Sequence, residues 1–404
     1  MNASVKKRPK ILLATYYNFP CKEQVIENIF AKELGKKYDI SIILKGKANN
    51  KKDIKWHNCK IILFKKFTEK NTKNIMLNKF FEFFNFINIF FLLKKYKFDS
   101  IIFRDLPGQL IIFSIFKKKF NFKLFYQSTA PLGDIDIVYG KRKKTINRYG
   151  YIIKGTFFNI CEKMAFSVAD IIFSISEYQK GNLEKHYPKK TIIPISMGVD
   201  EDWINYKSSK KGFLEKIKEK NKIITYFGTL NLTRNPQFII LVFNEMKKQI
   251  KKTKLLLIGS ANKKYETEYL KNMVKELDLQ NDVIFTGSLD RYTLIHYLKY
   301  CDISISAIPP CKIYKFSSPT KLYESLGNCI PVVANKGIME HEKVINQSGG
   351  GFLVNYNIKD FSNAIIKLLK NDELRINMGK NGKKYVLKEY NYRLIAKKIE
   401  KYFI

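Results

Sequence analysis

The sequence predicts an α/β protein made of two parallel-sheet domains in tandem. Its 404 residues exceed one ordinary hydrophobic core and suit two domains. Short Ile-rich runs alternate with longer segments of helical spacing, and the alternation restarts after a polar, lysine-rich stretch at 205–221. Apolar strands that are separated by helices are typical of a parallel sheet covered on both faces.

The first half contains seven runs that we expect to form strands, and three segments of helical character. The expected strands are 10–14, 40–44, 60–64, 100–103, 122–126, 170–174 and 191–194. The expected helices are 24–34, the aromatic segment from Phe80 to Leu93, and about 155–168.

The second half repeats the pattern as a complete Rossmann-like unit. We expect strands at 223–227, 255–258, 283–285, 303–306 and 331–334, and helices at 236–249, 265–277, 292–299, 321–326, 360–370 and 372–389. The first three strands end at Gly228, Gly259 and Gly287. Ligands of such sheets bind beyond the carboxyl ends of the strands, where these glycines lie.

The charge is strongly positive. There are 74 Lys and Arg against 36 Asp and Glu, which gives a formal net charge of +38. Either nucleic acid or an anionic membrane surface with anionic substrates fits this charge. The lysines are spread along the chain, and no Arg-rich tail is present. The six cysteines form no C-x-x-C, and the four histidines have no zinc-ligand spacing, so we expect no metal site and a cytoplasmic protein.

The aromatic segment from Phe80 to Leu93 is too short to span a bilayer. It has 14 residues, and a spanning helix needs about 20. Glu82, Asn85 and Asn88 form one polar stripe on a helix. Two alternatives remain: a helix packed against the sheet, or a helix lying in the plane of a membrane surface.

The segment Ser317–Ala334 (SSPTKLYESLGNCIPVVA) has the features of an anion-binding helix start. Ser318 suits the N-cap and Pro319 the first helical position. The free amides at Thr320 and Lys321 and the Lys321 ammonium would attract a phosphate, and the Glu324 carboxylate could accept hydrogen bonds from two ribose hydroxyls. The alternative is an ordinary capped helix with an exposed Glu–Lys pair.

The loop after the first strand of the second half is also suited to a phosphate. Gly228 lets a phosphate approach the backbone, and Arg234 can bind pyrophosphate with two donors. The alternative is a solvated arginine in a tight loop. No G-x-G-x-x-G or G-x-x-x-x-G-K-[ST] motif occurs, which argues against a dinucleotide oxidoreductase and a P-loop NTPase.

The second half resembles the donor-binding domain of the retaining GT-B glycosyltransferases of family 4. The resemblance covers about residues 165–395. It lies in FGTLNLTRNPQFII, KLLLIGS, DVIFTGSLDRYTLIHYLKYCDISISA, SSPTKLYESLGNCIPVVAN, GGGFLV, DELRINMGKNGKKYVLKEYNY and, in the first half, ADIIFSISEYQKGNL and TIIPISMGVDEDW.

This resemblance implies a GT-B fold, in which two Rossmann-like domains face a central cleft. Residues 1–204, joined by a returning C-terminal helix at about 391–404, would bind the acceptor, and 205–390 would bind a nucleotide-sugar donor. The implied donor-binding residues are Gly228, Thr229, Arg234, Ser318, Thr320, Lys321 and Glu324. Of these, Arg234, Lys321 and Glu324 are the implied catalytic residues. The chemistry would need no cofactor and no metal.

The sequence departs from the family at three places. Phe316 stands where the first of two paired glutamates would be, the N-terminal loop reads YNFPCKEQ at 17–24 where the family usually has a pair of glycines, and no histidine occurs in the acceptor-side region FYQSTAP at 125–131. Asp134-Ile-Asp136 resembles the metal-binding D-x-D of another glycosyltransferase fold, and we interpret it as coincidence or as ligands of acceptor hydroxyls. The acceptor-side candidates are thus Gln127, Ser128, Asp134 and Asp136.

The predicted function is retaining sugar transfer to a glycan or lipid-linked acceptor. Same-face attack, with the leaving phosphate taking the proton, fits the absence of paired carboxylates. Basic clusters at 65–66, 94–95, 117–119 and 141–144 would hold the first domain on the inner face of the cytoplasmic membrane. The alternatives are a basic nucleic-acid-binding protein, an epimerase on the same fold, and a degenerate protein that binds a nucleotide sugar without turnover.

Overall fold

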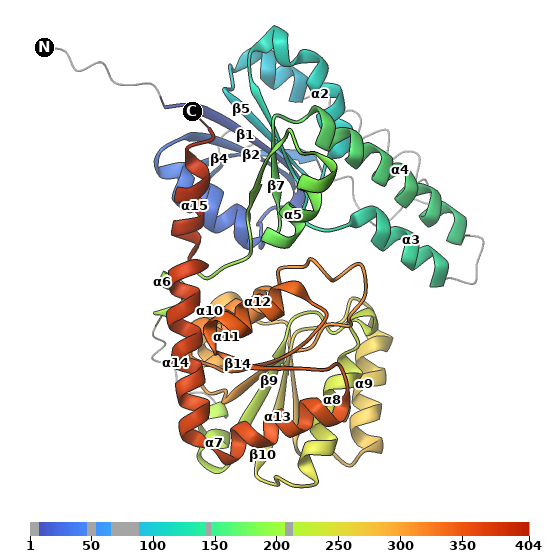
Figure 1. Ribbon diagram of the computed structural model, residues 1–404, viewed down its shortest axis with the longest axis vertical. Coiled ribbons are helices and arrows are strands. Elements are labelled where there is room, and N and C mark those ends of the chain that lie inside the picture. Colours follow the sequence, from blue (N-terminus) through green and yellow to red (C-terminus); the bar gives the residue numbers. More distant parts are fainter. Residues whose placement is uncertain (1–7, 47–53, 66–88, 143–146, 207–212, 404) are drawn as a thin grey trace, which may run out of the picture. The chain divides into compact units, whose positions relative to one another are not determined.

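The computed structural model describes residues 8–46, 54–65, 89–142, 147–206 and 213–403. These residues form two compact units (Figure 1). The first unit is Met1–Ser196 together with Tyr392–Ile404, and the second is Met197–Asn391. The α/β fold with two parallel-sheet domains that the sequence predicts is thereby confirmed.

The first unit is built on an eight-stranded sheet in the order β3-β4-β2-β1-β5-β6-β7-β8. All neighbours are parallel except β3, which is antiparallel to β4. The strands are β1 (Lys10–Asn18), β2 (Asp39–Gly46), β3 (Ile54–Trp56), β4 (Cys59–Lys65), β5 (Ser100–Arg104), β6 (Lys123–Gln127), β7 (Ile171–Ser174) and β8 (Thr191–Pro194). The short strand β3 was not predicted.

Helical segments cover this sheet. They are η1 (Val25–Glu33), η2 (Leu34–Lys36), α2 (Pro107–Phe120), α3 (Leu132–Arg142), α4 (Asn147–Val168), α5 (Glu177–His186) and α15 (Tyr392–Glu400). The sequence did not predict α2, α3 or α5, and it placed the start of α4 eight residues too late. The reason is visible in α2, where Ile112 and Ile115 are exposed. A helix is predicted from the regular alternation of apolar and polar residues along the chain. This alternation is lost when the outer face of the helix is apolar as well.

Only the end of the aromatic segment from Phe80 to Leu93 lies within the described residues. Residues 89–95 are helical. Ile89 and Leu93 are buried and join Phe98, Leu110 and Phe113 in the core of the first unit. At these two positions the packed-helix alternative is therefore confirmed; residues 80–88 lie outside the described part of the chain.

The second unit has a six-stranded parallel sheet in the order β11-β10-β9-β12-β13-β14. The strands are β9 (Lys222–Phe227), β10 (Thr253–Ile258), β11 (Val283–Gly287), β12 (Ile303–Ser306), β13 (Val332–Asn335) and β14 (Gly351–Val354). The helical segments are α6 (Glu201–Ile204), α7 (Phe213–Lys220), η3 (Leu232–Arg234), α8 (Pro236–Lys247), α9 (Lys264–Glu276), α10 (Arg291–Leu298), α11 (Thr320–Gly327), α12 (Met339–Ser348), α13 (Ile358–Lys370) and α14 (Asp372–Glu389).

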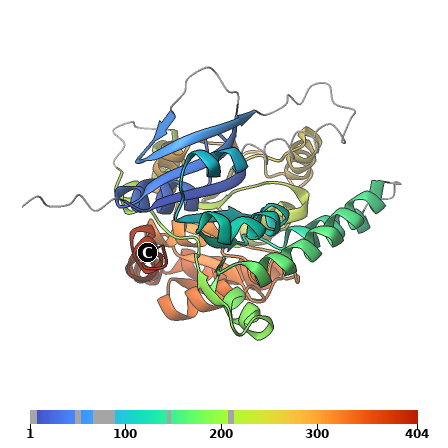
Figure 2. The same cartoon turned by 90° about the horizontal axis from the view of Figure 1, so that it is seen from above.

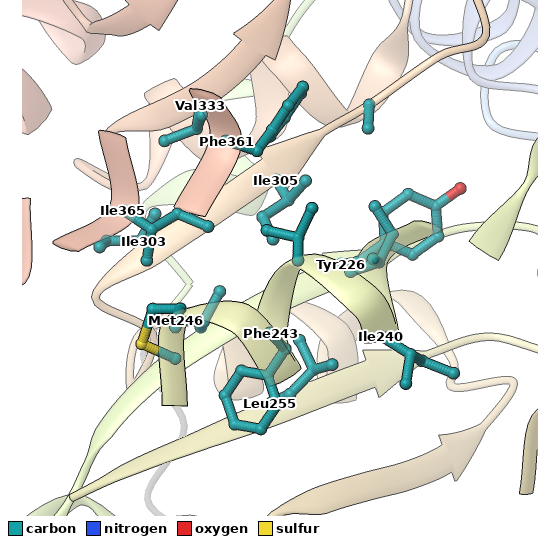
Figure 3. Close-up of a cluster of buried hydrophobic side chains, with 14 of the residues drawn as sticks. Tyr226, Ile240, Phe243, Met246, Leu255, Ile303, Ile305, Val333, Phe361 and Ile365 are labelled. Carbon is teal, nitrogen blue, oxygen red and sulfur yellow. The ribbon is translucent and has the colours of Figure 1, made fainter. Parts of the chain in front are cut away.

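The core of the second unit joins the central strands to helices α8 and α13 (Figure 3). Tyr226, Leu255 and Ile303 come from the sheet, and Phe243 from α8 and Phe361 from α13 pack against them. All five are buried. This packing fixes the strands whose carboxyl ends carry the predicted donor-binding residues.

Helices α6, α7 and α12 and strand β14 were not predicted. The inward face of α12 carries Glu340 and His341, which are both buried. The His341 ring lies 2.9 Å from Ser306 Oγ and 3.1 Å from the carbonyl oxygen of Asn335. A helix that buries hydrogen-bonded polar groups has a weak hydrophobic signal, so the pattern did not reveal it.

The division between the units differs from the predicted one. The prediction placed residues up to 204 in the first domain, whereas the second unit already begins at Met197. The reason is packing, since Trp203 and Ile204 of α6 are buried against Leu322 and Leu326 of α11. The chain returns to the first unit at Tyr392, one residue later than predicted, and α15 packs there against η1.

Helices α3 and α4 lie side by side and extend together from the first unit (Figures 1 and 2). They approach closely through two glycines. A Cβ on Gly155 would lie 2.3 Å from the carbonyl oxygen of Gly133, and a Cβ on Gly133 would lie 2.5 Å from that of Gly155. Backbone atoms occupy the space that a side chain would need.

We predict that Gly155→Ala lowers the melting temperature, although alanine favours a helix by about 1 kcal/mol over glycine. The added methyl group must push α3 away from α4. Gly150→Ala on the same helix is the control, because a Cβ there meets nothing within 4 Å. Thermal unfolding followed by circular dichroism measures both variants. Equal melting temperatures for the two would contradict the close approach.

Candidate active site

The carboxyl ends of β9 and β12 mark the point where the strand order of the second unit reverses. The chain passes from β9 outward to β10 and β11, and then continues on the other side of β9 with β12, β13 and β14. At such a point the connections leave the sheet in opposite directions and open a crevice for ligands. The sequence predicted its binding residues in the segments that follow these two strands.

The turns after β9 and β10 contact each other through glycine backbones. Gly228 has φ 129° and Gly259 has φ 131°, which side chains rarely adopt. A Cβ on Gly259 would lie 1.9 Å from the carbonyl oxygen of Gly228. The Gly228 amide donates to the carbonyl of Ile258 at 2.9 Å. Gly228 and the following Thr229 are exposed, so a ligand can reach this turn.

Lys321 lies beside the turn after β9, as the sequence predicted. Its Nζ is 3.8 Å from the centroid of the buried Tyr226 ring. A Cβ on Gly228 would lie 3.6 Å from the same Nζ. The ring holds the ammonium by a cation–π contact. The amides of Thr320 and Lys321 begin α11 and have no partner inside the helix, so the positive end of the helix adds to the lysine charge.

Ser318 does not cap α11, and that prediction was wrong. The N-cap position is Pro319. Ser318 is buried, its Oγ accepts a hydrogen bond from the Met197 amide at 3.0 Å, and it lies 3.0 Å from the Tyr323 hydroxyl. The Tyr323 hydroxyl donates to Glu340 Oε1 at 2.6 Å. Ser318 is thus engaged inside the unit and positions the segment before α11, which does not support its predicted contact with the donor.

Glu324 lies one turn into α11 and is only 4% exposed. The alternative of an exposed Glu–Lys pair is therefore wrong for this residue. A carboxylate is costly to bury unless it has partners, and a buried position is typical of a residue with a structural or binding task. Its role as a ligand of ribose hydroxyls stays a prediction.

Arg234 is exposed on η3, with its guanidinium carbon 4.2 Å from the centroid of the Tyr314 ring. The Arg234 side chain is therefore stacked on an aromatic ring and is not freely solvated. Stacking uses the face of the guanidinium and leaves its N–H groups at the edge, where they can reach a phosphate. The Leu232 amide donates to Glu266 Oε1 at 3.3 Å and holds this loop. Tyr314 and the half-buried Phe316 belong to the segment that leads to α11.

The first unit has its own reversal of strand order between β1 and β5, and buried charges lie there. Arg104 ends β5, is 2% exposed, and its Nη2 lies 2.9 Å from Glu23 Oε1. The next residue, Asp105, accepts hydrogen bonds from the backbone amide and the hydroxyl of Thr129. Burial raises the pKa of Asp105, although Arg104 and Thr129 oppose the rise. The sequence analysis did not identify these residues.

Gln127 ends the neighbouring strand β6 and Ser128 follows it; both are buried. Within the described part of the chain, the Oε1 atom of Gln127 has no hydrogen-bond donor. Ser128 Oγ donates to Glu162 Oε1 at 2.9 Å, and the Tyr126 hydroxyl donates to the same atom at 3.1 Å. The structure thus joins one predicted acceptor-side residue, Ser128, to a carboxylate that was not predicted.

Burial raises the pKa of Glu162 to about 7. The hydrogen bonds from Ser128 and Tyr126 lower it, and the nearby carboxylates of Asp105 and Asp134 raise it further. No motif marks Glu162. One signal could have revealed it, since Glu162 is the single acidic residue in the 22 residues of α4.

Asp134 and Asp136 link α3 to α4. Asn159 Nδ2 donates to Asp134 Oδ1 at 2.8 Å, and Lys154 Nζ lies 2.8 Å from Asp136 Oδ2. The two carboxylates therefore have separate partners on α4, which agrees with interpreting D-x-D as coincidence. Asp134 remains close enough to Glu162 to affect its pKa.

The buried His341 is not suited to act as a base. Burial lowers its pKa to about 3, and the charge of Lys321 also lowers it. The ring is therefore neutral near pH 7, and both nitrogens are within hydrogen-bond distance of Ser306 and Asn335. It holds the ends of β12 and β13 in place.

Comparison with known proteins finds one matching family model and one similar curated protein. Residues 209–385 match the family model described as glycosyl transferases group 1. This part of the chain is therefore similar to the group 1 glycosyl transferases. It is also 26% identical over 243 residues to the uncharacterized glycosyltransferase MJ1069 of Methanocaldococcus jannaschii. That alignment spans 60% of this chain and 60% of the relative.

Solved structures confirm the GT-B fold. The chain matches sucrose-phosphate synthase from Thermosynechococcus elongatus with a TM-score of 0.74 at 17% identity, over 98% of both chains. It matches Anabaena Alr3699/HepE in complex with UDP-glucose with a TM-score of 0.68 at 15% identity, over 97% of this chain and 98% of that one. At these identities the likeness concerns the fold.

We predict that Glu162 makes stability depend on pH. Its pKa of about 7 in the folded chain lies above its ordinary value of 4.5, so the folded chain binds the proton more tightly than the unfolded chain. The stability that the protonated Glu162 contributes to the fold is therefore complete below pH 4.5 and is lost as pH rises through 7. The unfolding free energy of the wild type relative to Glu162→Gln should therefore fall by about 1–3 kcal/mol between pH 5 and pH 8. Urea unfolding at several pH values measures it, with the exposed Glu177→Gln as control. A difference that does not change with pH would contradict this account of Glu162.

Proposed function

We propose that this chain is a retaining, metal-independent hexosyltransferase that moves a sugar from a nucleotide-sugar donor to a glycan or lipid-linked acceptor. We place it in the synthesis of cell-surface polysaccharide, lipopolysaccharide or glycolipid. The observation that carries the proposal is the position of Lys321 Nζ beside the exposed turn at Gly228, in a domain that matches the group 1 family.

The chemical task is to stabilise a leaving nucleoside diphosphate. Negative charge grows on its phosphate oxygens as the bond to the sugar breaks. Lys321, the positive end of α11 and the edge of the Arg234 guanidinium supply fixed positive charge. Groups that are held in place before the reaction stabilise the transition state without further reorganisation. Glu324 would hold the ribose.

Retention follows from same-face attack in this proposal, with the leaving phosphate accepting the proton of the acceptor hydroxyl. We assign acceptor binding to the first unit, where Gln127 ends β6, Ser128 follows it, and Glu162 of α4 accepts a hydrogen bond from Ser128. Near pH 7 a carboxyl group with the pKa of Glu162 exists in both forms, so it can donate to or accept from a hydroxyl.

The degenerate alternative keeps the donor site and lacks turnover. Phe316 at the position of the first paired glutamate favours it, because that glutamate would hold sugar hydroxyls in the resembling family. Binding and turnover must therefore be measured separately. Since the structure of Anabaena HepE contains UDP-glucose, this is the first donor to test, followed by GDP-, ADP-, CMP- and dTDP-sugars.

We predict that one nucleotide sugar raises the melting temperature of the native chain by mass action. Lys321→Ala should weaken its binding at least tenfold, because the phosphate loses a charge-assisted contact. Lys271→Ala, at an exposed position on α9, is the control. Isothermal titration calorimetry measures both. Equal affinity of the two variants would contradict the phosphate role of Lys321, and binding without any release of nucleotide would favour the degenerate alternative.

We also predict that Gly228→Ala weakens nucleotide binding more than Gly287→Ala. The φ angle is positive at both positions, 129° at Gly228 and 70° at Gly287, so both variants bear backbone strain of about 1–3 kcal/mol. Only at Gly228 would the new Cβ approach Lys321, at 3.6 Å from Nζ; at Gly287 it would meet nothing within 4 Å. The affinity for the nucleotide and the melting temperature of each variant separate the two effects. The same loss of affinity in both would mean that strain alone is responsible.

A further inference from the structure

Helix α4 carries a row of large apolar side chains on its outer surface. Tyr149, Ile153, Phe157, Ile160, Met164 and Val168 are all exposed, with Ile153 and Phe157 each at 68%. At about 100° per residue these six positions fall within an arc of about 100°, so they form one continuous apolar stripe along the helix. Solvated helices ordinarily present polar residues on this face.

Two features set the apolar stripe apart from scattered surface residues. It runs the length of a 22-residue helix, and α2, which packs against α4, adds the exposed Ile112 and Ile115. Of the 16 large hydrophobic residues that are exposed in the described part of the chain, eight therefore lie on these two neighbouring helices. A contiguous exposed apolar surface marks a site of interaction.

The charges beside the stripe are positive. Around the helix axis, at the same spacing of about 100° per residue, Lys163 lies about 40° outside one edge of the stripe and Lys154 about 40° outside the other. Both lysines are exposed. Lys154 pairs with Asp136, and Arg148 is exposed in the first turn. The only acid of α4, Glu162, is bonded to Ser128 and Tyr126. Helix α2 has no acidic residue and ends with Lys117, Lys118 and Lys119, of which Lys117 pairs with Asp170.

We propose that the apolar stripe of α4 is a docking surface for an anionic lipid bilayer. Apolar side chains would enter the boundary between headgroups and acyl chains, while the flanking lysines and Arg148 would contact lipid phosphates. Tyr149 suits the interfacial depth, because its ring is apolar and its hydroxyl polar. Among the described residues, no helix is long and apolar enough to cross a membrane.

A second copy of the chain is the other occupant that such a stripe could have. Charge argues against it, because two basic surfaces would be brought together in a chain with a net charge of +38. An anionic bilayer gains from the same charges. This inference deepens the proposed function, and it rests on that function only for the link to a lipid-linked acceptor. Binding to a bilayer does not itself require that the chain transfers a sugar.

The test is binding of the full chain to vesicles at low salt. We expect it to bind vesicles that contain phosphatidylglycerol and to bind phosphatidylcholine vesicles at least tenfold more weakly. The double variant Ile153→Asn/Phe157→Asn should lose at least tenfold in binding to the anionic vesicles. Both residues are exposed, so the melting temperature should not change. Tyr265→Asn/Tyr269→Asn, at two exposed aromatic residues of α9, is the control.

Three outcomes would overturn the docking surface. They are no binding of the wild type to anionic vesicles, equal binding of the two double variants, and a wild-type dimer in sedimentation that becomes monomeric in the stripe variant. A nucleotide-release assay in detergent-free buffer is run on the same samples. Vesicle binding without nucleotide release would contradict the proposed function alone, and nucleotide release without vesicle binding would contradict the docking surface alone.

Discussion

The proposed donor site depends on how closely the turns after β9 and β10 approach each other. The carbonyl oxygen of Gly228 occupies the place where Gly259 would carry a Cβ, at a distance of 1.9 Å. Both residues adopt a positive φ to allow it. The consequence is an exposed backbone turn at the centre of the sheet edge, with the Lys321 ammonium beside it. The packing of Tyr226, which lies under that ammonium, connects this turn to the core of the second unit.

The charged groups at the point where the strand order reverses differ between the two units. In the second unit the charges that meet the exposed turn are positive and come from a lysine and a helix start. In the first unit the charges are buried: Arg104 pairs with Glu23, and Glu162 shares the hydroxyls of Tyr126 and Ser128. Fixed positive charge suits a diphosphate, whereas hydroxyl and carboxyl groups suit a sugar or another polyol.

The sequence predicted best where local chemistry and the resembling motifs act together. Gly228 and Lys321 were expected near one phosphate, and in the structure a Cβ added to Gly228 would lie 3.6 Å from the lysine nitrogen. It predicted poorly where a polar side chain is buried or an apolar side chain is exposed. Helix α12 buries His341, and α4 exposes Phe157, so neither has the usual period. Glu162 could not be linked to Ser128 because their contact joins residues 34 positions apart.

The measurement that tests the central claim most directly is a double-mutant cycle on nucleotide-sugar affinity, with Gly228→Ala, Lys321→Ala and their combination. If the turn and the ammonium bind the same phosphate, the two losses will not add, and the coupling will be at least about 0.5 kcal/mol. Calorimetric titration with UDP-glucose, or with whichever nucleotide sugar stabilises the wild type, gives the four affinities. Strictly additive losses would contradict a shared phosphate site.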